Sequence, residues 1–463
     1  MQKKYNKTGL LSYIKKYNKK IKLILIQGGT MSKNKKKAKR LNKSRRSFLN
    51  LALSGTVSAS ALYLGLTKDL YAAPSGPIVI GHQCELTGGF SSWGYWHDKC
   101  AKAAVKVINE SGGIAGRKVK LETEDTESNP AVGSRKLRSL IERKGSSFVV
   151  GSVHSGIMLA SIPVATELKT PYFSAGEATE ATGSKGSRYS FRTGTDTYAL
   201  AAAGAPWAFE NLGKNWTMIF PDYAWGHSHH QEHKKIIESL GGKVNDPIAV
   251  PLGTKDLVPY LSKIPEETEV LFSVFFGALS VAFYTQQKTM RLDEKMKMYS
   301  VSGTIEAIDP RDIGGATEGV YFLENFPRPL EFKNDQYHKD FIKLMDVDPV
   351  YAKENGSNKV MAKSHCWQSY ENFFALKSAI EQSGWKTKKD TPAVIKALEG
   401  LEMKNSFAHP QGAKKLRAQD HSGIIDCYMS RVEKSKFVLK KKISKEEMEK
   451  ILPPRYDFTK YSL

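Results

Sequence analysis

The chain alternates between short apolar segments and amphipathic segments over most of its length. Over residues 101–108, apolar side chains recur at positions i, i+3, i+4 and i+7, which is the pattern of one helix face. Further helices are predicted at residues 130–141 and 157–165. Short strands are predicted between these helices, at residues 77–81, 119–123, 148–151 and 171–173. This alternation predicts an α/β fold with a parallel sheet between helices.

The same alternation begins again downstream. Strands are predicted at residues 216–220 and 270–275, and helices at residues 227–240 and 278–288. Two such series indicate two doubly wound parallel sheets. Because such sheets bind ligands beyond the carboxyl ends of their strands, the residues that follow each strand are the candidate site.

Three loops rich in Gly, Ser and Thr follow predicted strands, at residues 85–94, 151–156 and 174–179. Hydroxyl groups and free backbone N–H groups at a helix N-terminus can bind a carboxylate or another anion. Ordinary helix capping uses the same residue types, so both interpretations remain open. No phosphate-loop lysine follows these glycines and no G-x-S-x-G motif is present, which argues against nucleotide hydrolysis and a serine hydrolase.

The positive charge of the chain is concentrated at its amino terminus. The formal net charge is +23, but residues 1–46 contain 17 Lys and Arg and no acidic residue. Lys68 and Asp69 cancel, so residues 74–463 carry only +6. We therefore predict that the body of the protein does not bind nucleic acid.

Residues 44–50 read Ser-Arg-Arg-Ser-Phe-Leu-Asn, which matches the twin-arginine export signal S-R-R-x-F-L-K except at Asn50. The apolar stretch that follows, residues 48–66, is diluted by Ser, Thr and Gly. This mild hydrophobicity is typical of twin-arginine signals. We predict that residues 44–73 are a signal peptide for the twin-arginine export machinery and that the protein is periplasmic.

The residues before this signal are predicted to be a basic, disordered leader at residues 1–43, with Met31 as an alternative start. We expect cleavage near residues 71–74. An uncleaved membrane anchor is the alternative, since residues 48–66 approach the length that spans a bilayer.

Four other features leave their interpretation open. Cys84 and Cys100 are close enough in sequence to form a disulfide, or they are unpaired and buried. His229 and His233 are spaced i, i+4 within a cluster that also contains His227 and His230, and they either share a metal or belong to a solvated polar face. We favour the solvated face and predict no metal and no cofactor. The lysine-rich run at residues 434–450 is predicted to be a solvated C-terminal tail.

In order along the chain, several motifs resemble the type I periplasmic binding proteins of the leucine/isoleucine/valine, amide and urea group. Residues 109–116, Asn-Glu-Ser-Gly-Gly-Ile-Ala-Gly, look like the N-x-x-G-G-I-x-G motif of that family. Four other segments also resemble motifs of that family. They are an early turn at residues 85–88, two internal motifs at residues 191–193 and 223–226, and a closing R-x-x-D-H pattern at residues 417–421.

The resemblance implies the type I periplasmic-binding-protein fold, with two doubly wound parallel-sheet lobes joined by a three-crossover hinge. Lobe 1 would comprise residues 78–196 plus 328–422, and lobe 2 residues 197–327 plus 423–440. Residues 441–463 would form the C-terminal tail.

The resemblance also implies ligand-binding roles in lobe 1. Trp93 matches an aromatic residue that stacks over the ligand, and Ser152 or Ser155 matches a hydroxyl group that binds the ligand carboxylate. The second loop of the family shares that task, which points to Ala175, Glu177 and Thr179. His154 either caps a helix or lines the pocket and donates to an anionic ligand.

Further ligand contacts are implied at the hinge and in lobe 2. Asp196 matches the carboxylate that faces an ammonium group, while Trp225 and Phe276 match aromatic residues that close over the ligand. Ser302 stands where amino-acid binders often have an acidic residue, and Glu306 lies a little further on. Because a buried ammonium group needs compensating charge, this departure admits neutral amides and organic acids as ligands.

We therefore predict a non-enzymatic, monomeric solute-binding protein. It would capture an amino acid, an amide or urea-like compound or an organic acid, and deliver it to the permease of an ABC transporter. A ligand sensor for a membrane signalling partner is the alternative. An enzyme that uses His154, Glu177 or the histidine cluster is disfavoured, because the sequence shows no assembled nucleophile–base pair.

Overall fold

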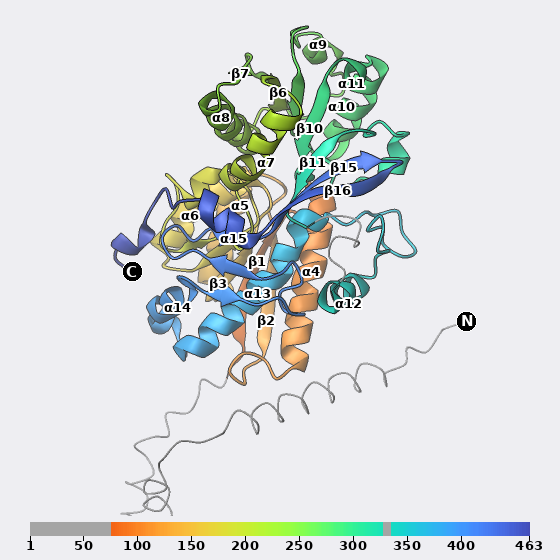
Figure 1. Cartoon of the computed structure of the whole chain (residues 1–463). Coiled ribbons are helices and arrows are strands. Elements are labelled where there is room, and N and C mark those ends of the chain that lie inside the picture. Colours follow the sequence, from red (N-terminus) through yellow and green to blue (C-terminus); the bar gives the residue numbers. More distant parts are fainter. Residues whose placement is uncertain (1–75, 327–334) are drawn as a thin grey trace, which may run out of the picture. The chain divides into compact units, whose positions relative to one another are not determined.

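Two separate sheets with helices on both faces organise the chain in the computed structural model (Figure 1). The structure describes residues 76–326 and 335–463. The predicted leader and signal peptide therefore lie outside the described residues.

The first sheet belongs to lobe 1 and has the strand order β2-β1-β3-β4-β5, with all neighbours parallel. Its strands are β1 (Ile78–Cys84), β2 (Val119–Asp125), β3 (Phe148–Gly151), β4 (Tyr172–Ser174) and β5 (Ser190–Phe191). Successive residues of β3 point to opposite faces, where Phe148 and Val150 join one core and Val149 joins the other. The helices of this lobe are α4 (Ser91–Glu110), α5 (Pro130–Arg138), α6 (Ser155–Glu167), α12 (Gln336–Met345), α13 (Lys363–Ser383) and α14 (Thr391–Leu398).

The second sheet belongs to lobe 2 and has the order β16-β15-β11-β10-β9-β6-β7, with β8 also paired to β6. The parallel strands are β6 (Asn215–Pro221), β7 (Lys243–Val244), β8 (Ile248–Val250), β9 (Val270–Ser273), β10 (Lys297–Val301) and β11 (Tyr321–Glu324). An antiparallel hairpin of β15 (Cys427–Glu433) and β16 (Lys436–Ile443) extends it. Its helices are α7 (Thr197–Asn211), α8 (Ala224–Ser239), α9 (Val258–Leu261), α10 (Gly277–Thr289), α11 (Leu292–Lys295) and α15 (Lys445–Ile451).

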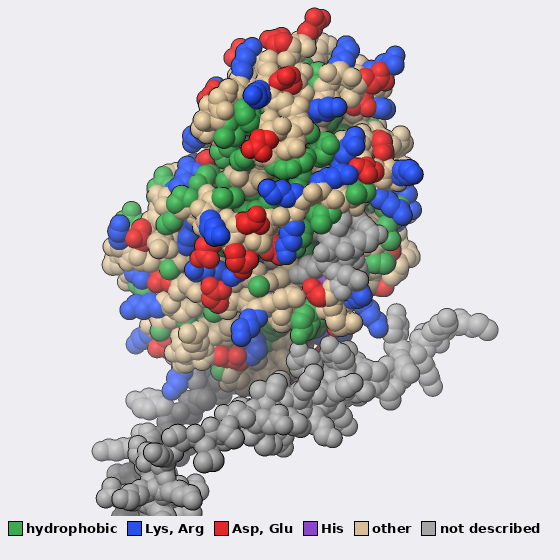
Figure 2. Space-filling view, viewed as in Figure 1, with side chains coloured by type: hydrophobic (Ala, Val, Ile, Leu, Met, Phe, Trp, Pro, Cys, Tyr) green, Lys and Arg blue, Asp and Glu red, His purple; other side chains and the backbone are tan. Residues whose placement is uncertain are grey.

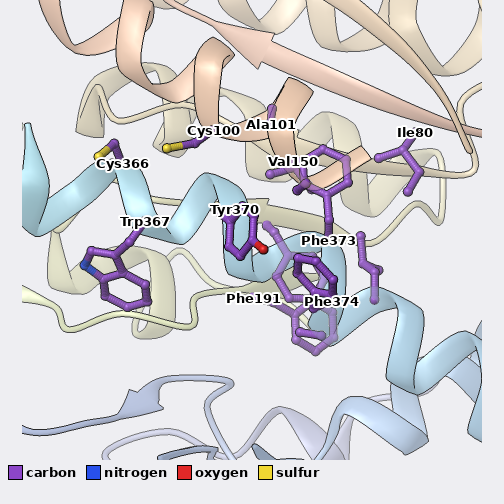
Figure 3. Packing of buried hydrophobic residues seen from close by; sticks show 14 of the residues in the cluster. Ile80, Cys100, Ala101, Val150, Phe191, Cys366, Trp367, Tyr370, Phe373 and Phe374 are labelled. Atoms are coloured by element: carbon purple, nitrogen blue, oxygen red, sulfur yellow. The ribbon is translucent and has the colours of Figure 1, made fainter. Parts of the chain in front are cut away.

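A long helix from the second half of the chain completes the core of lobe 1. Helix α13 packs against α4, so that Trp367, Tyr370 and Phe373 share one apolar cluster with Cys100 and Val150 (Figure 3). A small antiparallel sheet follows it, made of β12 (Glu402–Met403), β13 (Lys414–Leu416) and β14 (Gly423–Ile424). Lobe 1 is therefore built from two stretches of sequence that lobe 2 separates.

The chain passes between the lobes three times, and hydrogen bonds tie the passages together. Asn325, after β11, donates to Thr195 Oγ1 in the first passage at 2.9 Å. Gln411 donates to the backbone oxygen of Asn325 at 2.9 Å and to that of Asp426, in the third passage, at 3.3 Å. These bonds connect the three passages to one another.

The C-terminal residues are ordered, so the prediction of a solvated tail is wrong. Residues 436–443 form β16, where Phe437 and Ile443 are buried while most of the lysines face outward. Helix α15 begins with a capping box of Ser444 and Glu447 and buries Met448. The apolar residues interleaved with the lysines dock this segment on lobe 2, which composition alone did not reveal.

The described surface carries both signs of charge. Lys and Arg side chains are interspersed with Asp and Glu side chains over the visible face (Figure 2). Within the described residues, no helix has both the length and the apolar character that a membrane crossing requires.

Candidate functional site

A small cavity lies between the lobes, and side chains from both lobes line it. We call it the inner cavity, and its volume is about 20 Å³, enough for about one water molecule. Its walls are mostly aromatic, and the lining residues are Phe90, Trp93, Val153, Glu177, Tyr223, Trp225, Phe276, Gly303 and His365. All of these except His365 come from the loops or first helical turns that follow β1, β3, β4, β6, β9 and β10, because the carboxyl ends of the parallel strands lie at one edge of each sheet.

Phe276 lies at the centre of the aromatic wall. Its ring centroid is 4.4 Å from that of Phe90, 5.6 Å from that of Tyr223 and 5.9 Å from that of Trp93. Phe90 and Trp93 come from lobe 1, whereas Tyr223 and Phe276 come from lobe 2. The ring contacts therefore join the two lobes across the cleft.

A histidine between two glutamates forms the polar part of the site. His365, in the first turn of α13, has Nδ1 2.5 Å from Oε2 of Glu306 and Nε2 3.0 Å from Oε1 of Glu177. All three side chains are buried. With a carboxylate at each ring nitrogen, the imidazolium form can pair with both.

The pKa shifts of this cluster follow from its geometry. Burial alone would lower the pKa of His365, but the charges of Glu306 and Glu177 outweigh it and raise the pKa well above 6.5. Burial would raise the pKa of Glu177, but His365 and His229 hold it well below its ordinary value. His365 is therefore charged and Glu177 ionised at neutral pH.

Both indole groups of the cavity are oriented by these carboxylates. Trp93 Nε1 donates to Glu306 Oε2 at 3.1 Å, and Trp225 Nε1 donates to Glu177 Oε2 at 2.9 Å. Since an indole has only one donor, each Trp can offer a ligand only its ring surface.

The loop that was expected to bind a ligand carboxylate already holds a carboxylate of the protein. The hydroxyl of Ser152 donates to Glu85 Oε1, and the backbone N–H groups of Val153 and His154 make longer bonds to the same side chain at 3.5 Å and 3.4 Å. Gly94 allows the chain at Glu85 to come this close to α4, since a Cβ at Gly94 would lie 1.8 Å from the carbonyl oxygen of Glu85.

The second predicted loop, residues 174–179, is fixed by groups on both lobes. Arg192 is buried and donates to the backbone oxygens of Glu177 and Ala178 at 3.3 Å and 2.9 Å. The hydroxyl of Thr179 lies 2.6 Å from that of Thr197 in lobe 2. These contacts position the Glu177 carboxylate at the cavity.

The structure brings four of the predicted site residues to the inner cavity, namely Trp93, Glu177, Trp225 and Phe276. Their role in ligand binding stays a prediction. Asp196 does not line the cavity, because its carboxylate caps α7 through Ala199 N at 2.7 Å and accepts from Thr182 at 2.9 Å. Ser302 lies in the turn after β10, next to the lining residue Gly303.

The remaining predicted residues have structural partners. Ser155 begins α6 and its hydroxyl accepts from Ala178 N at 3.3 Å. Ala175 donates its N–H to the backbone oxygen of Ser152 at 3.0 Å. His154 is the N-cap of α6, with Nδ1 accepting from Ile157 N at 3.2 Å, and burial lowers its pKa to about 4.

A larger cavity lies on the other side of Phe90 and Phe276. We call it the outer cavity; its volume is about 470 Å³, and its lining includes Phe90, His154, Lys255 and Phe276. His154 therefore caps a helix and also lines this cavity, while its role in ligand binding stays a prediction. Phe90 and Phe276 line both cavities.

The predicted solvated histidine face is wrong for two of its members. His229 and His233 are fully buried on α8, and the ring centroid of His233 lies 4.1 Å from that of Phe272. His227 is exposed and lies 2.7 Å from Asp222. In the described part of the chain, no group of three or more His, Cys, Asp or Glu residues could hold a metal ion.

The cysteines are buried and unpaired. Cys84 donates to the backbone oxygen of Gly94 at 3.2 Å, and Cys100 lies 3.4 Å from the sulfur of Met345. Of the two possibilities for Cys84 and Cys100, the structure shows free thiols.

Sequence reasoning missed the most strongly charged contact of the site. His365 stands at the start of a helix far along the chain, and neither spacing nor composition marked it. Phe90 and Tyr223 belong to loops that were singled out, so their aromatic character next to a strand end was an available signal. The structure places Glu306, which follows Ser302 closely in the sequence, against His365 and Trp93.

Known proteins resemble this chain over most of its length. A family model described as periplasmic binding protein matches residues 77–436. Leu/Ile/Val-binding protein homolog 3 of Brucella melitensis is 28% identical over 357 residues, which cover 76% of this chain and 89% of that protein. Leu/Ile/Val-binding protein homolog 8 of Brucella abortus is 23% identical over 287 residues, which cover 58% and 71% respectively.

Solved structures share the fold. A solute-binding protein of an ABC transporter from R. palustris, in complex with benzoate, has a TM-score of 0.68 and 17% identity, covering 80% of this chain and 97% of that one. A branched-chain amino acid transporter substrate-binding protein from Streptococcus pneumoniae, in complex with isoleucine, has a TM-score of 0.64 and 18% identity. The match covers 79% of this chain and 100% of that one.

These matches and the two-sheet architecture together settle the class of protein. The chain belongs to the periplasmic binding protein family. The predicted α/β type I periplasmic-binding-protein fold is confirmed. The relatives are solute-binding proteins, and family membership implies a place outside the cytoplasm.

Proposed function

We propose that this protein captures a small molecule between its lobes and delivers it to the permease of an ABC transporter. The observation that supports this is the inner cavity, whose aromatic walls come from both lobes. A ligand bound there would hold the lobes together, and the closed form would be the one that docks on the permease. Capture of this kind needs only one copy of the chain, so we propose a monomer.

Several ligand classes are compatible with this proposal at the level of the fold. Relatives bear names that refer to leucine, isoleucine and valine, and solved neighbours hold benzoate or isoleucine. Amino acids, amides, urea-like compounds and organic acids therefore make a first screening library.

A binding screen tests capture directly. A ligand that binds only the folded protein should raise the melting temperature, and at 100 times its Kd it adds about 2.7 kcal/mol to the free energy of unfolding. Melting curves of the purified protein measure this effect. Unchanged melting curves across the whole library would contradict the proposal.

Replacing Trp93 by Ala should weaken binding of the ligand found in that screen at least about tenfold, which corresponds to about 1.4 kcal/mol. The change removes a ring from the cavity wall and the donor that orients Glu306. Isothermal titration calorimetry measures the loss. Trp207→Ala is the matched control, because Trp207 packs against Tyr321 in lobe 2 and does not line the cavity. Full affinity in Trp93→Ala would show that the ligand binds elsewhere.

We further propose that residues 44–73 direct the protein to the periplasm through the twin-arginine route. Replacing both Arg45 and Arg46 by Lys should keep the protein in the cytoplasmic fraction, because the pair is the recognised part of the signal. Cell fractionation followed by immunoblotting measures the distribution. Lys39→Arg is a control that changes a basic residue outside the motif. Unchanged periplasmic protein after the double substitution would exclude this route.

A further inference from the structure

We propose that the inner cavity, which in this structure has room for about one water molecule, opens to bind the positively charged group of an organic amine or ammonium compound, and that it selects against a ligand whose only charge is a carboxylate. This inference rests on the proposed function and gives it a ligand class.

The first step is that a carboxylate of the protein itself already occupies the loop that was predicted to bind an anion. Ser152, Val153 and His154 direct one hydroxyl and two backbone N–H groups to the carboxylate of Glu85. These are the donors that a ligand carboxylate would need at the N-terminus of α6. A ligand carboxylate would have to displace a buried side chain of the protein, which leaves that side chain without its hydrogen bonds.

The second step is the charge around the cavity. Glu177 and Glu306 are 1% and 2% exposed, and only His365 lies between them as a cation. Burial lowers the pKa of His229, so this neighbour of Glu177 adds no positive charge at neutral pH. Two carboxylates against one imidazolium leave one buried negative charge, which a bound cation would compensate.

The buried Arg192, which lies close to Glu177, does not change this balance. Arg192 is directed to the backbone oxygens of Glu177 and Ala178, and its guanidinium lies 3.9 Å from the carboxylate of Asp196. That pair is neutral overall. Glu85 adds no positive charge, and burial lowers the pKa of His154 to about 4, so His154 is neutral as well.

The third step is that an acceptor oxygen beside the cavity remains available. Oε1 of Glu177 is already paired with Nε2 of His365 at 3.0 Å. Oε1 of Glu306, by contrast, is buried and accepts no hydrogen bond from the described residues. Buried carboxylate oxygens in native proteins are usually satisfied, so an ammonium N–H is the expected partner.

The last step is the character of the walls. Five aromatic rings line the cavity, and the N–H groups of both tryptophans are already used by the glutamates. The rings therefore present π surface, which attracts a cation and offers a carboxylate no donor. Rings together with carboxylates form a cage suited to a positively charged head group.

Ligand pairs that share one shape and differ in charge test this inference on the purified full chain. Benzylamine is compared with benzoate, 3-methylbutylamine with 4-methylpentanoate, and choline with its neutral analogue 3,3-dimethylbutan-1-ol. Leucine carries the ammonium and the carboxylate together. Calorimetry at pH 7 should give a Kd at least about tenfold lower for a charged amine than for its partner, a difference of about 1.4 kcal/mol.

Glu177→Gln should raise the Kd of the preferred amine at least about tenfold, because it removes the carboxylate that lines the cavity. Glu306→Gln should act in the same direction. Glu354→Gln is the matched control, since that glutamate pairs with Lys99 at 2.6 Å in lobe 1 and lines neither cavity. Melting curves of each variant show whether it is folded.

Tighter binding of benzoate or 4-methylpentanoate than of the matching amine would overturn the inference. Failure of every amine in the series, while the broad screen yields a neutral or anionic ligand, would also overturn it and would leave the capture function intact. Failure of the broad screen as a whole would count against the capture function itself.

Discussion

Replacing His365 by Gln is expected to lower the free energy of unfolding by about 3–5 kcal/mol at pH 6, because it leaves two buried carboxylates without their shared cation. In the native protein, the two ring nitrogens lie 2.5 Å from Glu306 and 3.0 Å from Glu177. Gln has the size to fill the space but carries no charge. Chemical denaturation followed by tryptophan fluorescence measures the loss.

The effect of His365→Gln should depend on pH in a defined direction. Because the pKa of His365 is raised well above 6.5 in the folded protein, its stabilising contribution is fully present below pH 6.5. Above that pH the unfolded chain loses its proton first, so the contribution is lost as the pH rises through the folded pKa. The difference between native protein and variant should therefore be largest near pH 6 and should shrink at pH 9.

His97→Gln is a control for which the stability difference from the native protein should depend on pH in the opposite direction. Burial lowers the pKa of His97 well below 6.5, so this histidine is neutral when folded, with Nδ1 2.5 Å from Ser369 Oγ. The native protein should then lose stability relative to His97→Gln as the pH falls below 6.5. A loss in His365→Gln that does not vary between pH 6 and pH 9 would show that His365 is not the charged partner of the glutamates.

Replacing Lys414 by Met is expected to lower the free energy of unfolding by about 3–5 kcal/mol, for the same physical reason at a second position. Lys414 and Glu371 are fully buried and form an ion pair, and the ammonium group also lies 4.0 Å from the centre of the Trp367 ring. Burial would raise the pKa of Glu371, but Lys414 and His409 outweigh it and lower the pKa. Met fills the space and leaves the Glu371 charge uncompensated.

The double variant Glu371→Gln/Lys414→Met should recover about half or more of this loss, since neither buried charge then remains. Gln at position 371 can still accept the hydrogen bond from Gln411 N, which is 2.8 Å long in the native protein. Lys377→Met is the surface control, because its pair with Glu381 on α13 is solvent-accessible and should contribute at most about 1 kcal/mol. A double variant as unstable as the single one would contradict a charge-based explanation.

Local sequence patterns predicted the elements of both lobes well. The buried strands at residues 148–151 and 216–220 and the helix at residues 227–240 appear as β3, β6 and α8 with small changes at their ends. These elements follow from hydrophobic periodicity, which depends on neighbours a few residues away. The C-terminal segment was mispredicted because its lysines dominate the composition while only Phe437, Ile443 and Met448 dock it.

The location of the site was also available from the sequence. Parallel strands in one lobe end at the same edge, so Trp93 and Glu177 had to lie at one edge of lobe 1, and Trp225 and Phe276 at one edge of lobe 2. The family resemblance implied that these two edges face each other. The structure places these four side chains around one cavity.

The chemistry of the site was decided only by the tertiary structure. The sequence presented Asp196 as the candidate carboxylate for an ammonium group and Ser152 as the donor to a ligand carboxylate. In the folded protein, Asp196 caps a helix and Ser152 donates to Glu85, while His365 from α13 joins Glu177 to Glu306. The partner of a buried charge, and with it the charge left for a ligand, depends on which distant elements pack together, and periodicity within one element carries no information about that choice.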